Sequence, residues 1–191
     1  MVRSSPAAGH GDVRDGLAVN LEPMRRRHLR SVLRIESGVY AAPWSLSLFI
    51  SELSLRASRS YTVAKVDGAV VGYSGLMLSM DEGHVTTVAV DPSWHRNQIG
   101  TRLMLDMVHV AIKRGVRHMT LEVRVANSGA QRMYSRFGFA PEGIRRNYYA
   151  ETGEDAMVMW ARDVDSQEYA ERLRLLEEGV RGPTLVPEGR W

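Results

Sequence analysis

The spacing of apolar and polar residues along the chain predicts strands and helices in a mixed order. Runs that alternate in polarity, or that are short and continuously apolar, are typical of strands. Such runs cover residues 17–21, 61–66, 69–77, 85–90, 118–124 and 156–161, and a further short strand begins at Phe139-Ala140. Asp67-Gly68, between the second and third of these runs, predicts a two-residue hairpin turn.

Apolar residues spaced three or four apart predict helices between these strands. The expected segments are 24–39, a short helix after Ser45 to about residue 55, 100–114, and 127–138. Ser45 suits an N-cap, and Gly115 suits the position just after a helix. A last amphipathic helix follows residue 165, and we expect its apolar side to pack on the chain's own core through Tyr169, Leu173 and Leu176.

The order of elements predicts an α/β (α+β) fold of one domain. Its first half is rich in hairpins, and its second half alternates strand and helix, which indicates a mixed, mostly antiparallel central sheet flanked by helices. Residues 1–16 are rich in Gly, Ser, Ala and Pro and are expected to form a disordered tail. The domain is expected over residues 17–162, followed by a C-terminal amphipathic helix and an extended tail over residues 163–191.

Residues 88–103 contain the most informative local pattern, VAVDPSWHRNQIGTRL. The apolar strand stops at Asp91-Pro92, a polar turn follows, and the next helix begins near Gly100. A helix N-terminus presents unpaired backbone N–H groups and the positive end of the helix dipole. This junction therefore predicts a site for a phosphate or a pyrophosphate.

Composition narrows the possible functions. The 191 residues include no cysteine, which excludes thiol nucleophiles, disulfides and thiolate metal sites, and no metal site is expected. No apolar run is typical of a signal peptide or approaches about 18 residues, so we expect a cytoplasmic protein without a membrane span. The formal net charge is +3, with the excess positive charge in the middle of the chain, which suits an anionic cofactor.

A run of four arginines within residues 25–30 invites an RNA-binding interpretation. The same segment supplies an apolar stripe made of Leu29, Val32, Leu33 and Ile35. This stripe favours a solvated helix face over an RNA site.

Three polar residues beyond the anion site are candidates for chemistry, and each has an ordinary structural alternative. Glu122 lies on the polar side of strand 118–124, where most strand glutamates simply face solvent. Asn127 and Tyr134 share a helix face, because seven residues make two turns. Asn127 is also a natural N-cap, and Tyr134 a natural core residue, so the residues alone leave both interpretations open.

Three motifs in order resemble the GNAT acetyltransferase superfamily: VAVDPSWHRNQIGTRLM, LEVRVANSGAQRMYSRFGF and IRRNYY. Over about residues 17–162 they look most like the bacterial ribosomal-protein-alanine N-acetyltransferases. The resemblance implies a GNAT-like fold and transfer of acetyl from acetyl-coenzyme A (acetyl-CoA), the cosubstrate, by direct attack of an amine. It implies the N-terminal peptide of a small-subunit ribosomal protein, beginning with alanine, as partner, with no membrane or direct nucleic-acid role.

The resemblance also implies roles for individual residues. Glu122 is similar to the family's general base, and Tyr134 is similar to the acid that protonates the departing thiolate. The strand that pairs with the pantetheine arm matches Val88, Ala89 and Val90. The pyrophosphate loop and a further cofactor contact match Arg96, Asn97, Gln98, Ile99, Gly100, Thr101 and Asn127. The substrate side matches Pro43 and Trp44 after the first helix and Arg146, Asn147 and Tyr148 in the inter-strand loop 145–149, which is equally typical of a basic surface loop.

An N-terminal amine suits this predicted site better than a lysine does. An α-amine has a pKa of about 7.7–8.0, against about 10.4 for lysine, so neutralising lysine at pH 7 costs roughly 3.5 kcal/mol more. A single carboxylate base is therefore better matched to an N-terminal amine.

The anion loop departs from the family pattern at Gln98, where the resemblance leads us to expect glycine. If this position requires a positive φ, a residue other than glycine costs about 1–2 kcal/mol and weakens cofactor binding about tenfold. His95 also replaces the usual Gln or Arg, but keeps a hydrogen-bond donor. Two alternative functions follow: acetylation of a small amine or another protein terminus, or a non-catalytic module that binds coenzyme A or RNA.

Overall fold

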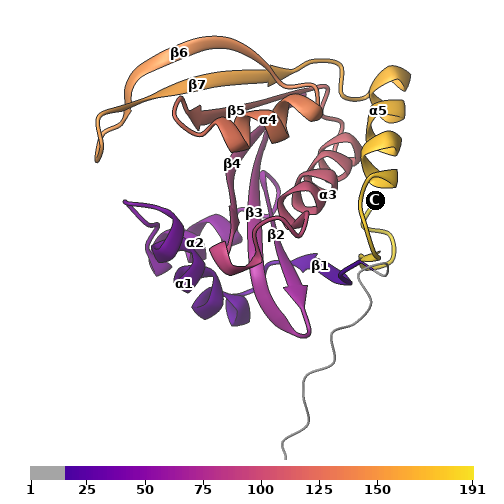
Figure 1. The fold of residues 1–191 in the computed structure, drawn as a ribbon, viewed down its shortest axis with the longest axis horizontal. Coiled ribbons are helices and arrows are strands. Elements are labelled where there is room, and N and C mark those ends of the chain that lie inside the picture. The colour runs from indigo at the N-terminus through magenta and orange to yellow at the C-terminus, as the bar shows by residue number, and fades with distance from the viewer. Residues whose placement is uncertain (1–15) are drawn as a thin grey trace, which may run out of the picture.

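The structure, a computed structural model, describes residues 16–191. These residues form an eight-stranded sheet with five α-helices (Figure 1). The strands are β1 (Val19–Pro23), β2 (Arg59–Val66), β3 (Ala69–Ser79), β4 (Glu82–Val90), β5 (His118–Arg124), β6 (Ala140–Tyr149), β7 (Glu154–Ala161) and β8 (Thr184–Leu185). The helices are α1 (Leu29–Val39), α2 (Leu46–Ser54), α3 (Ile99–Lys113), α4 (Ser128–Arg136) and α5 (Gln167–Glu178), with 3-10 turns η1 (Arg26–His28) and η2 (Pro92–Trp94).

The strands are ordered β6-β7-β5-β4-β3-β2-β1-β8 across the sheet. Neighbouring strands are antiparallel except for β4 with β5 and β1 with β8. Asp67 and Gly68 join β2 to β3 with φ angles of 48° and 81°, as the predicted tight hairpin turn requires. The predicted mixed, mostly antiparallel sheet flanked by helices is confirmed.

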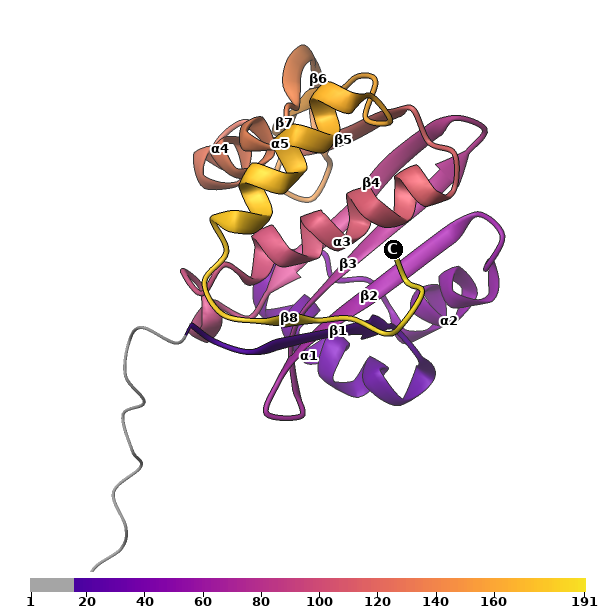
Figure 2. The ribbon, with the colours of Figure 1, turned by 90° about the vertical axis from the view of Figure 1, so that its right-hand side faces the viewer.

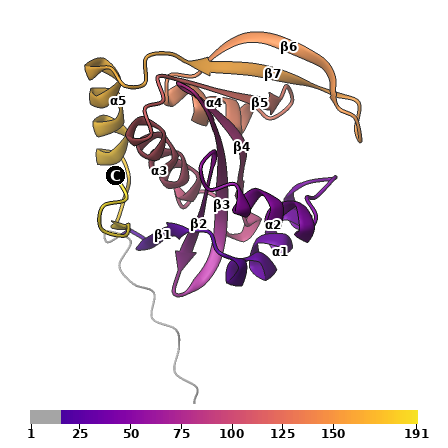
Figure 3. The ribbon, with the colours of Figure 1, turned by 180° about the vertical axis from the view of Figure 1, so that it is seen from behind.

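Helices cover both faces of the central strands. Figure 3 shows α1 and α2 on one side of β2, β3 and β4, and α3 on the other. On the α1 side, Val32 and Phe49 pack with Tyr73 and Ala89 of the sheet. On the other side, α3 packs through a continuous apolar face in which Leu103, Met104 and Val108 are fully buried. α5 adds to the same core through Tyr169, Leu173 and Leu176, which confirms that this helix packs on its own chain.

β4 and β5 pair only over their first halves. The last paired residues are Val85 and Leu121, although both strands continue beyond them. A bulge in β4 lies at the same point, because Leu76 of β3 pairs with Val85 and Gly75 pairs with Thr87, which leaves Thr86 between them. Bulges bend a strand and increase its twist, so the bulge directs the end of β4 away from β5.

Residues 145–149 form the end of β6 rather than the predicted inter-strand loop. Nearly every residue of β6 is exposed, because it is an edge strand with neither face in the core. A strand without a buried face lacks the alternation of polarity that predicts strands. The segment is irregular, since its register against β7 shifts between Arg145 and Tyr149, and Asn147 has a φ of 50°.

Two other predictions need correction. Residues 24–39 do not form one continuous helix, because η1 precedes α1. The C-terminal segment is extended as predicted, yet it also contributes strand β8, which pairs with β1. The predicted disordered tail over residues 1–16 lies outside the described residues, apart from Gly16. Within residues 16–191, no helix is both long enough and apolar enough to cross a membrane.

Candidate active site

The divergence of β4 from β5 leaves backbone groups of β4 directed into a gap. The N–H of Asp91 donates to the carbonyl of Val71 in β3, so the backbone groups of Asp91 face β3. In a strand the backbone groups of successive residues point to opposite sides, so the N–H and C=O groups of Val88 and Val90 point away from β3. In agreement, the Val88 carbonyl accepts from the Tyr40 hydroxyl at 3.2 Å, and the Val90 carbonyl accepts from His95 Nε2 at 3.1 Å.

A cavity of about 470 Å³ occupies this gap. β4 and β5 form its floor, α4 closes one side, and residues after α1 and at the end of β6 form the opposite walls. Among the residues that line it, those with polar side chains or aromatic rings include Glu36, Tyr40, Trp44, His84, Thr87, Glu122, Arg124, Asn127, Tyr134, Tyr148 and Tyr149. Glu122, Asn127 and Tyr134, the three candidates for chemistry, therefore meet in one cavity.

Glu122 is a buried carboxylate rather than a solvent-facing one, with 7% of its side chain exposed. Its Oε2 lies 2.6 Å from His84 Nε2, and its Oε1 lies 3.0 Å from Arg145 Nη1. The hydrogen bond with His84, aided by the positive charge of Arg145, holds the pKa of Glu122 below its ordinary value although burial opposes this shift. The group is therefore ionised at neutral pH.

Tyr134 lies on α4 and lines the cavity. Its ring packs against Phe139, with ring centroids 6.0 Å apart, and 8% of the residue is exposed. Burial raises the pKa of Tyr134 well above its ordinary value, so the hydroxyl keeps its proton at neutral pH. Asn127 caps the same helix, where its Oδ1 accepts from the Ala130 N–H at 3.1 Å.

A buried carboxylate at the end of α1 orders the loop between α1 and α2. Glu36 is 2% exposed, and its Oε1 accepts from the Trp44 N–H at 2.8 Å. The Tyr73 hydroxyl also donates to Glu36. Ser45 then caps α2 by accepting from the Leu48 N–H at 3.2 Å, as predicted. The loop thus presents Trp44 to the cavity, while Pro43 is exposed and is not among the lining residues.

The end of β6 supplies the facing wall. Tyr148 and Tyr149 both line the cavity, and Tyr149 packs its ring under Arg124, whose Cζ lies 3.9 Å from the ring centroid. Burial raises the pKa of Tyr149 to about 12. Arg146 and Asn147 instead point to Asp155: Arg146 Nη1 donates to it at 2.7 Å, and the Asn147 N–H donates to it at 2.9 Å. Of the five predicted substrate residues, Trp44 and Tyr148 reach the cavity.

The predicted anion loop joins η2 to the first turn of α3. After η2, Arg96 and Gln98 take positive φ angles of 67° and 57°, and α3 begins at Ile99. Gly100 lies in the first turn, where an added Cβ would approach Met133 Sδ of α4 to 3.2 Å. Ile99 and Thr101 are buried, so their side chains are not available to a ligand.

These features fit a nucleotide thioester such as acetyl-CoA. The first-turn N–H groups of α3 and the helix dipole suit its pyrophosphate. The backbone groups of Val88 and Val90 suit an amide-containing arm, whereas the side chain of Ala89 is buried toward α1. Within residues 16–191, no cluster of three or more His, Asp or Glu side chains is arranged to hold a metal ion.

Sequence reasoning missed His84 as a site residue, and it included Arg145 only within the predicted loop 145–149, without its contact with Glu122. His84 lies ahead of the predicted strand 85–90, since β4 begins three residues earlier, at Glu82. The sequence contains a sign of the bulge, because two polar residues in succession, Thr86 and Thr87, interrupt the alternation of apolar and polar residues in this strand. Arg145 was placed in a loop rather than on a strand beside β7.

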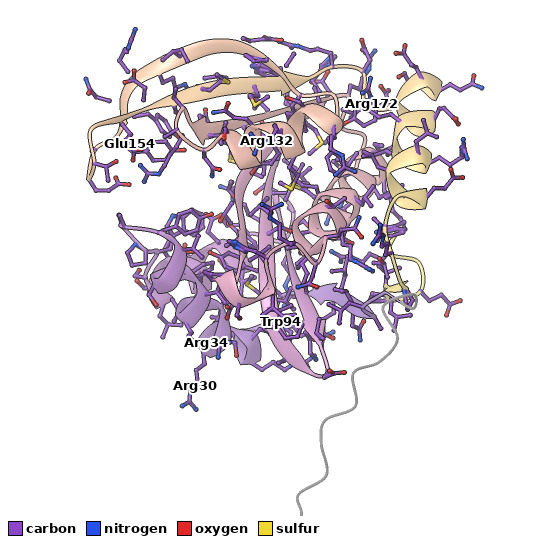
Figure 4. The ribbon with its side chains drawn as sticks, in the orientation of Figure 1. Arg30, Arg34, Trp94, Arg132, Glu154 and Arg172 are labelled. Atoms are coloured by element: carbon purple, nitrogen blue, oxygen red, sulfur yellow. The ribbon has the colours of Figure 1, made fainter. Side chains whose placement is uncertain are left out.

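The arginine run at residues 25–30 lies away from the cavity. Leu29, Val32 and Ile35 are buried on the inner side of α1, as the apolar stripe predicts. Figure 4 shows Arg30 and Arg34 on the outer side of α1, pointing away from the β6–β7 hairpin. The run is thus divided between η1 and α1, and all four of its arginines are exposed to solvent.

Comparison with known proteins matches the chain to one family model and to several enzymes. The model of the acetyltransferase (GNAT) family matches residues 29–139. A putative [ribosomal protein bS18]-alanine N-acetyltransferase of Bacillus subtilis is 36% identical over 72% of this chain and 91% of its own length. The [ribosomal protein bS18]-alanine N-acetyltransferase of Escherichia coli K12 is 33% identical over 69% of this chain and 88% of its own. The crystal structure of the ribosomal-protein-S18-alanine N-acetyltransferase from Escherichia coli superposes with a TM-score of 0.70, at 29% identity, covering 76% of this chain and 94% of that one.

Proposed function

The chain belongs to the GNAT acetyltransferase family and is an acetyl-CoA-dependent N-acetyltransferase, and we propose that its acceptor is the α-amine of a protein N-terminus. Its target in this proposal is the N-terminal alanine of a small-subunit ribosomal protein. The observation that carries the proposal is the pairing of an ionised Glu122 with a protonated Tyr134 in one cavity. Acetyl-CoA supplies the activated acetyl thioester.

In the proposed mechanism Glu122 is the general base. Its carboxylate accepts a proton from the incoming ammonium group, directly or through one water, so that the nitrogen lone pair becomes available. The lowered pKa keeps the carboxylate ionised, and His84 and Arg145 fix both of its oxygens. Attack forms the C–N bond directly and breaks the C–S bond, which requires no covalent intermediate on the protein.

Tyr134 is the general acid in this mechanism. The sulfur that leaves carries a negative charge, and a hydroxyl held protonated by burial is able to neutralise it. The Tyr134 proton goes to sulfur. The nitrogen loses one proton to Glu122 before the attack and a second proton once the C–N bond has formed. One of these two protons returns to Tyr134 through water and the other is released to solvent, so both groups regain their starting states.

The walls of the cavity support a peptide as the acceptor. Trp44 and Tyr40 lie after α1 on one side, and Tyr148 and Tyr149 lie at the end of β6 on the other. Aromatic side chains offer broad apolar contact together with a polar tip, which suits a short extended peptide. An α-amine needs less help in losing its proton than a lysine does, since its pKa is about 7.7–8.0 against about 10.4.

The ribosomal target rests on the relatives. Both the Bacillus subtilis and the Escherichia coli proteins are named as acting on the alanine of ribosomal protein bS18, the former as a putative enzyme. The chain covers about nine-tenths of each relative's length. The predicted roles of Pro43, Arg146 and Asn147 in holding the peptide stay proposals.

A panel of acceptors tests this proposal. Purified full-length protein is given acetyl-CoA with short peptides that differ only in their first residue, and in parallel with spermidine and with an α-blocked peptide that contains lysine. We expect the highest kcat/KM for the peptide that begins with alanine. Preference for spermidine would make the enzyme a small-amine acetyltransferase, and preference for the blocked peptide would make it a lysine acetyltransferase.

A further inference from the structure

The segment after α5, residues 179–191, which we call the C-terminal strap, lies along α3. Figure 2 shows it leaving α5, passing beside β1 as β8 and returning toward α3 at the C-terminus. α3 presents to it a row of polar side chains spaced three or four residues apart, which share one helix face. This row consists of Gln98, Arg102, Asp106, His109 and Lys113, and each member contacts the strap by a hydrogen bond or by ring stacking.

The middle of the strap is fixed by buried polar contacts. Arg102 is fully buried, and its guanidinium donates to the carbonyls of Pro183 at 2.8 Å and Arg181 at 2.5 Å. Asp106 is fully buried as well, and it accepts from Arg190 Nη2 at 2.6 Å. Asp106 is thus paired with a charged group, whereas Arg102 is held by backbone carbonyls, and both contacts tie the strap to α3. The strap is therefore a fixed part of the fold rather than a free tail.

Gln98 connects this strap to the anion loop. Its Nε2 donates to the Gly179 carbonyl at 2.8 Å, and its Oε1 accepts from the Arg181 N–H at 2.9 Å. Both ends of the amide are thus used, and both partners are backbone groups of the strap. Gln98 is also the residue with a φ of 57° immediately before α3, so it shapes the first turn that offers N–H groups to a pyrophosphate.

We propose that Gln98 is a positioning residue, which holds the pyrophosphate loop in its binding geometry by hydrogen-bonding to Gly179 and Arg181 of the strap. Without those two bonds the left-handed backbone at a residue other than glycine is disfavoured, and the loop spends part of its time in other conformations. If the loop has its binding geometry for only a fraction of the time, the apparent affinity for coenzyme A is multiplied by that fraction. The strap therefore contributes to coenzyme A affinity without touching the ligand.

This inference depends on acetyl-CoA as the cosubstrate and not on which amine is acetylated. The strap lies outside the family match, which ends at residue 139, whereas Gln98 lies within it. The relatives match over 69–72% of this chain and 88–91% of their own length, so this chain is the longer one. Glycine, which the family pattern places at the Gln98 position, needs no side-chain contact to hold a positive φ.

Three variants test the proposal by titration calorimetry with coenzyme A, and by steady-state kinetics. Gln98→Ala removes both hydrogen bonds and keeps the unfavourable backbone, so we expect the Kd for coenzyme A to rise about tenfold. Gln98→Gly also removes the bonds, but glycine adopts a positive φ without strain, so we expect the Kd for coenzyme A to rise only about threefold. For both, the KM for acetyl-CoA should rise in parallel, with kcat at saturating acetyl-CoA unchanged.

Lys113→Ala is the matched control, because Lys113 donates to Gly189 at the far end of α3 and does not contact the loop. It should leave the Kd for coenzyme A unchanged. Hydrogen exchange gives a second readout: the amides of residues 98–101 should exchange faster in Gln98→Ala than in Lys113→Ala. A Kd for Gln98→Gly equal to or below that of the wild type would overturn the proposal, since the loop would then be set by its own backbone alone.

Discussion

Replacing Glu122 by Gln removes the carboxylate while keeping the size and shape of the side chain. The amide oxygen of Gln still accepts a hydrogen bond, so the contact with His84 at 2.6 Å is expected to persist. Arg145, whose side chain is 56% exposed, loses its charged partner but is able to turn to solvent. The variant is therefore expected to fold, and what it loses is the capacity to accept a proton.

The size of the effect follows from that loss. Positioned general bases contribute about 10²–10⁴-fold to rate, which corresponds to about 2.7–5.5 kcal/mol of barrier. We expect kcat of Glu122→Gln to fall by this factor with an alanine-starting peptide. The Kd for coenzyme A should stay within about twofold of wild type, because Glu122 lies on β5 and the anion loop lies between β4 and α3.

The assay is release of coenzyme A at saturating acetyl-CoA, with calorimetric binding of coenzyme A as the check on folding. Glu142→Gln is the matched control, since Glu142 pairs with Arg162 at 2.7 Å on the exposed edge strand and does not line the cavity. Its kcat should equal that of the wild type. A kcat for Glu122→Gln within about threefold of wild type, with coenzyme A binding intact, would refute the base assignment.

Three further outcomes follow from the structure. Tyr134→Phe keeps the ring packed against Phe139 and should lower kcat by about 10²-fold or more with unchanged circular dichroism, whereas unchanged kcat would rule out Tyr134 as the acid. Asp106→Ala leaves Arg190 and Thr62 without their buried partner and should lower the free energy of unfolding in urea by about 2–3 kcal/mol; a change below about 0.5 kcal/mol would contradict this. The pKa of Glu122 is lower in the folded than in the unfolded chain, so its ionisation stabilises the fold above about pH 4.5, and this contribution is lost as pH falls through the folded pKa. The stability difference between wild type and Glu122→Gln should therefore shrink between pH 7 and pH 3.5, and a constant difference would count against the shift.

Most of the fold was predictable because most elements have one buried and one exposed face. The β2–β3 hairpin, the caps Ser45 and Asn127, and the buried side of α5 all match the sequence pattern. The start of β6 was predicted at Phe139-Ala140, but its extent to Tyr149 was missed, because an exposed edge strand needs no alternation of polarity. η1 and β8 were missed because a single 3-10 turn and a two-residue strand carry too few residues for any period to emerge.

Individual site residues could be predicted from the sequence, whereas the tertiary contacts between them could not. The pattern placed Glu122 on the polar side of β5, but its burial depends on His84 and Arg145, which come from two other strands. Gln98 has a φ of 57°, which meets the condition under which a residue other than glycine carries a backbone cost. Its contacts with residues 81 and 83 positions further along the chain are tertiary, and local sequence carries no trace of them.

We expect this cavity to acetylate an α-amine with Glu122 as the base. The most direct test is a single peptide that begins with alanine and contains one internal lysine, incubated with acetyl-CoA and mapped by tandem mass spectrometry. We expect the wild type to place acetyl on the terminal nitrogen alone, and Glu122→Gln to form this product at least 10²-fold more slowly. Acetyl on the lysine side chain, or equal terminal acetylation by wild type and variant, would contradict it.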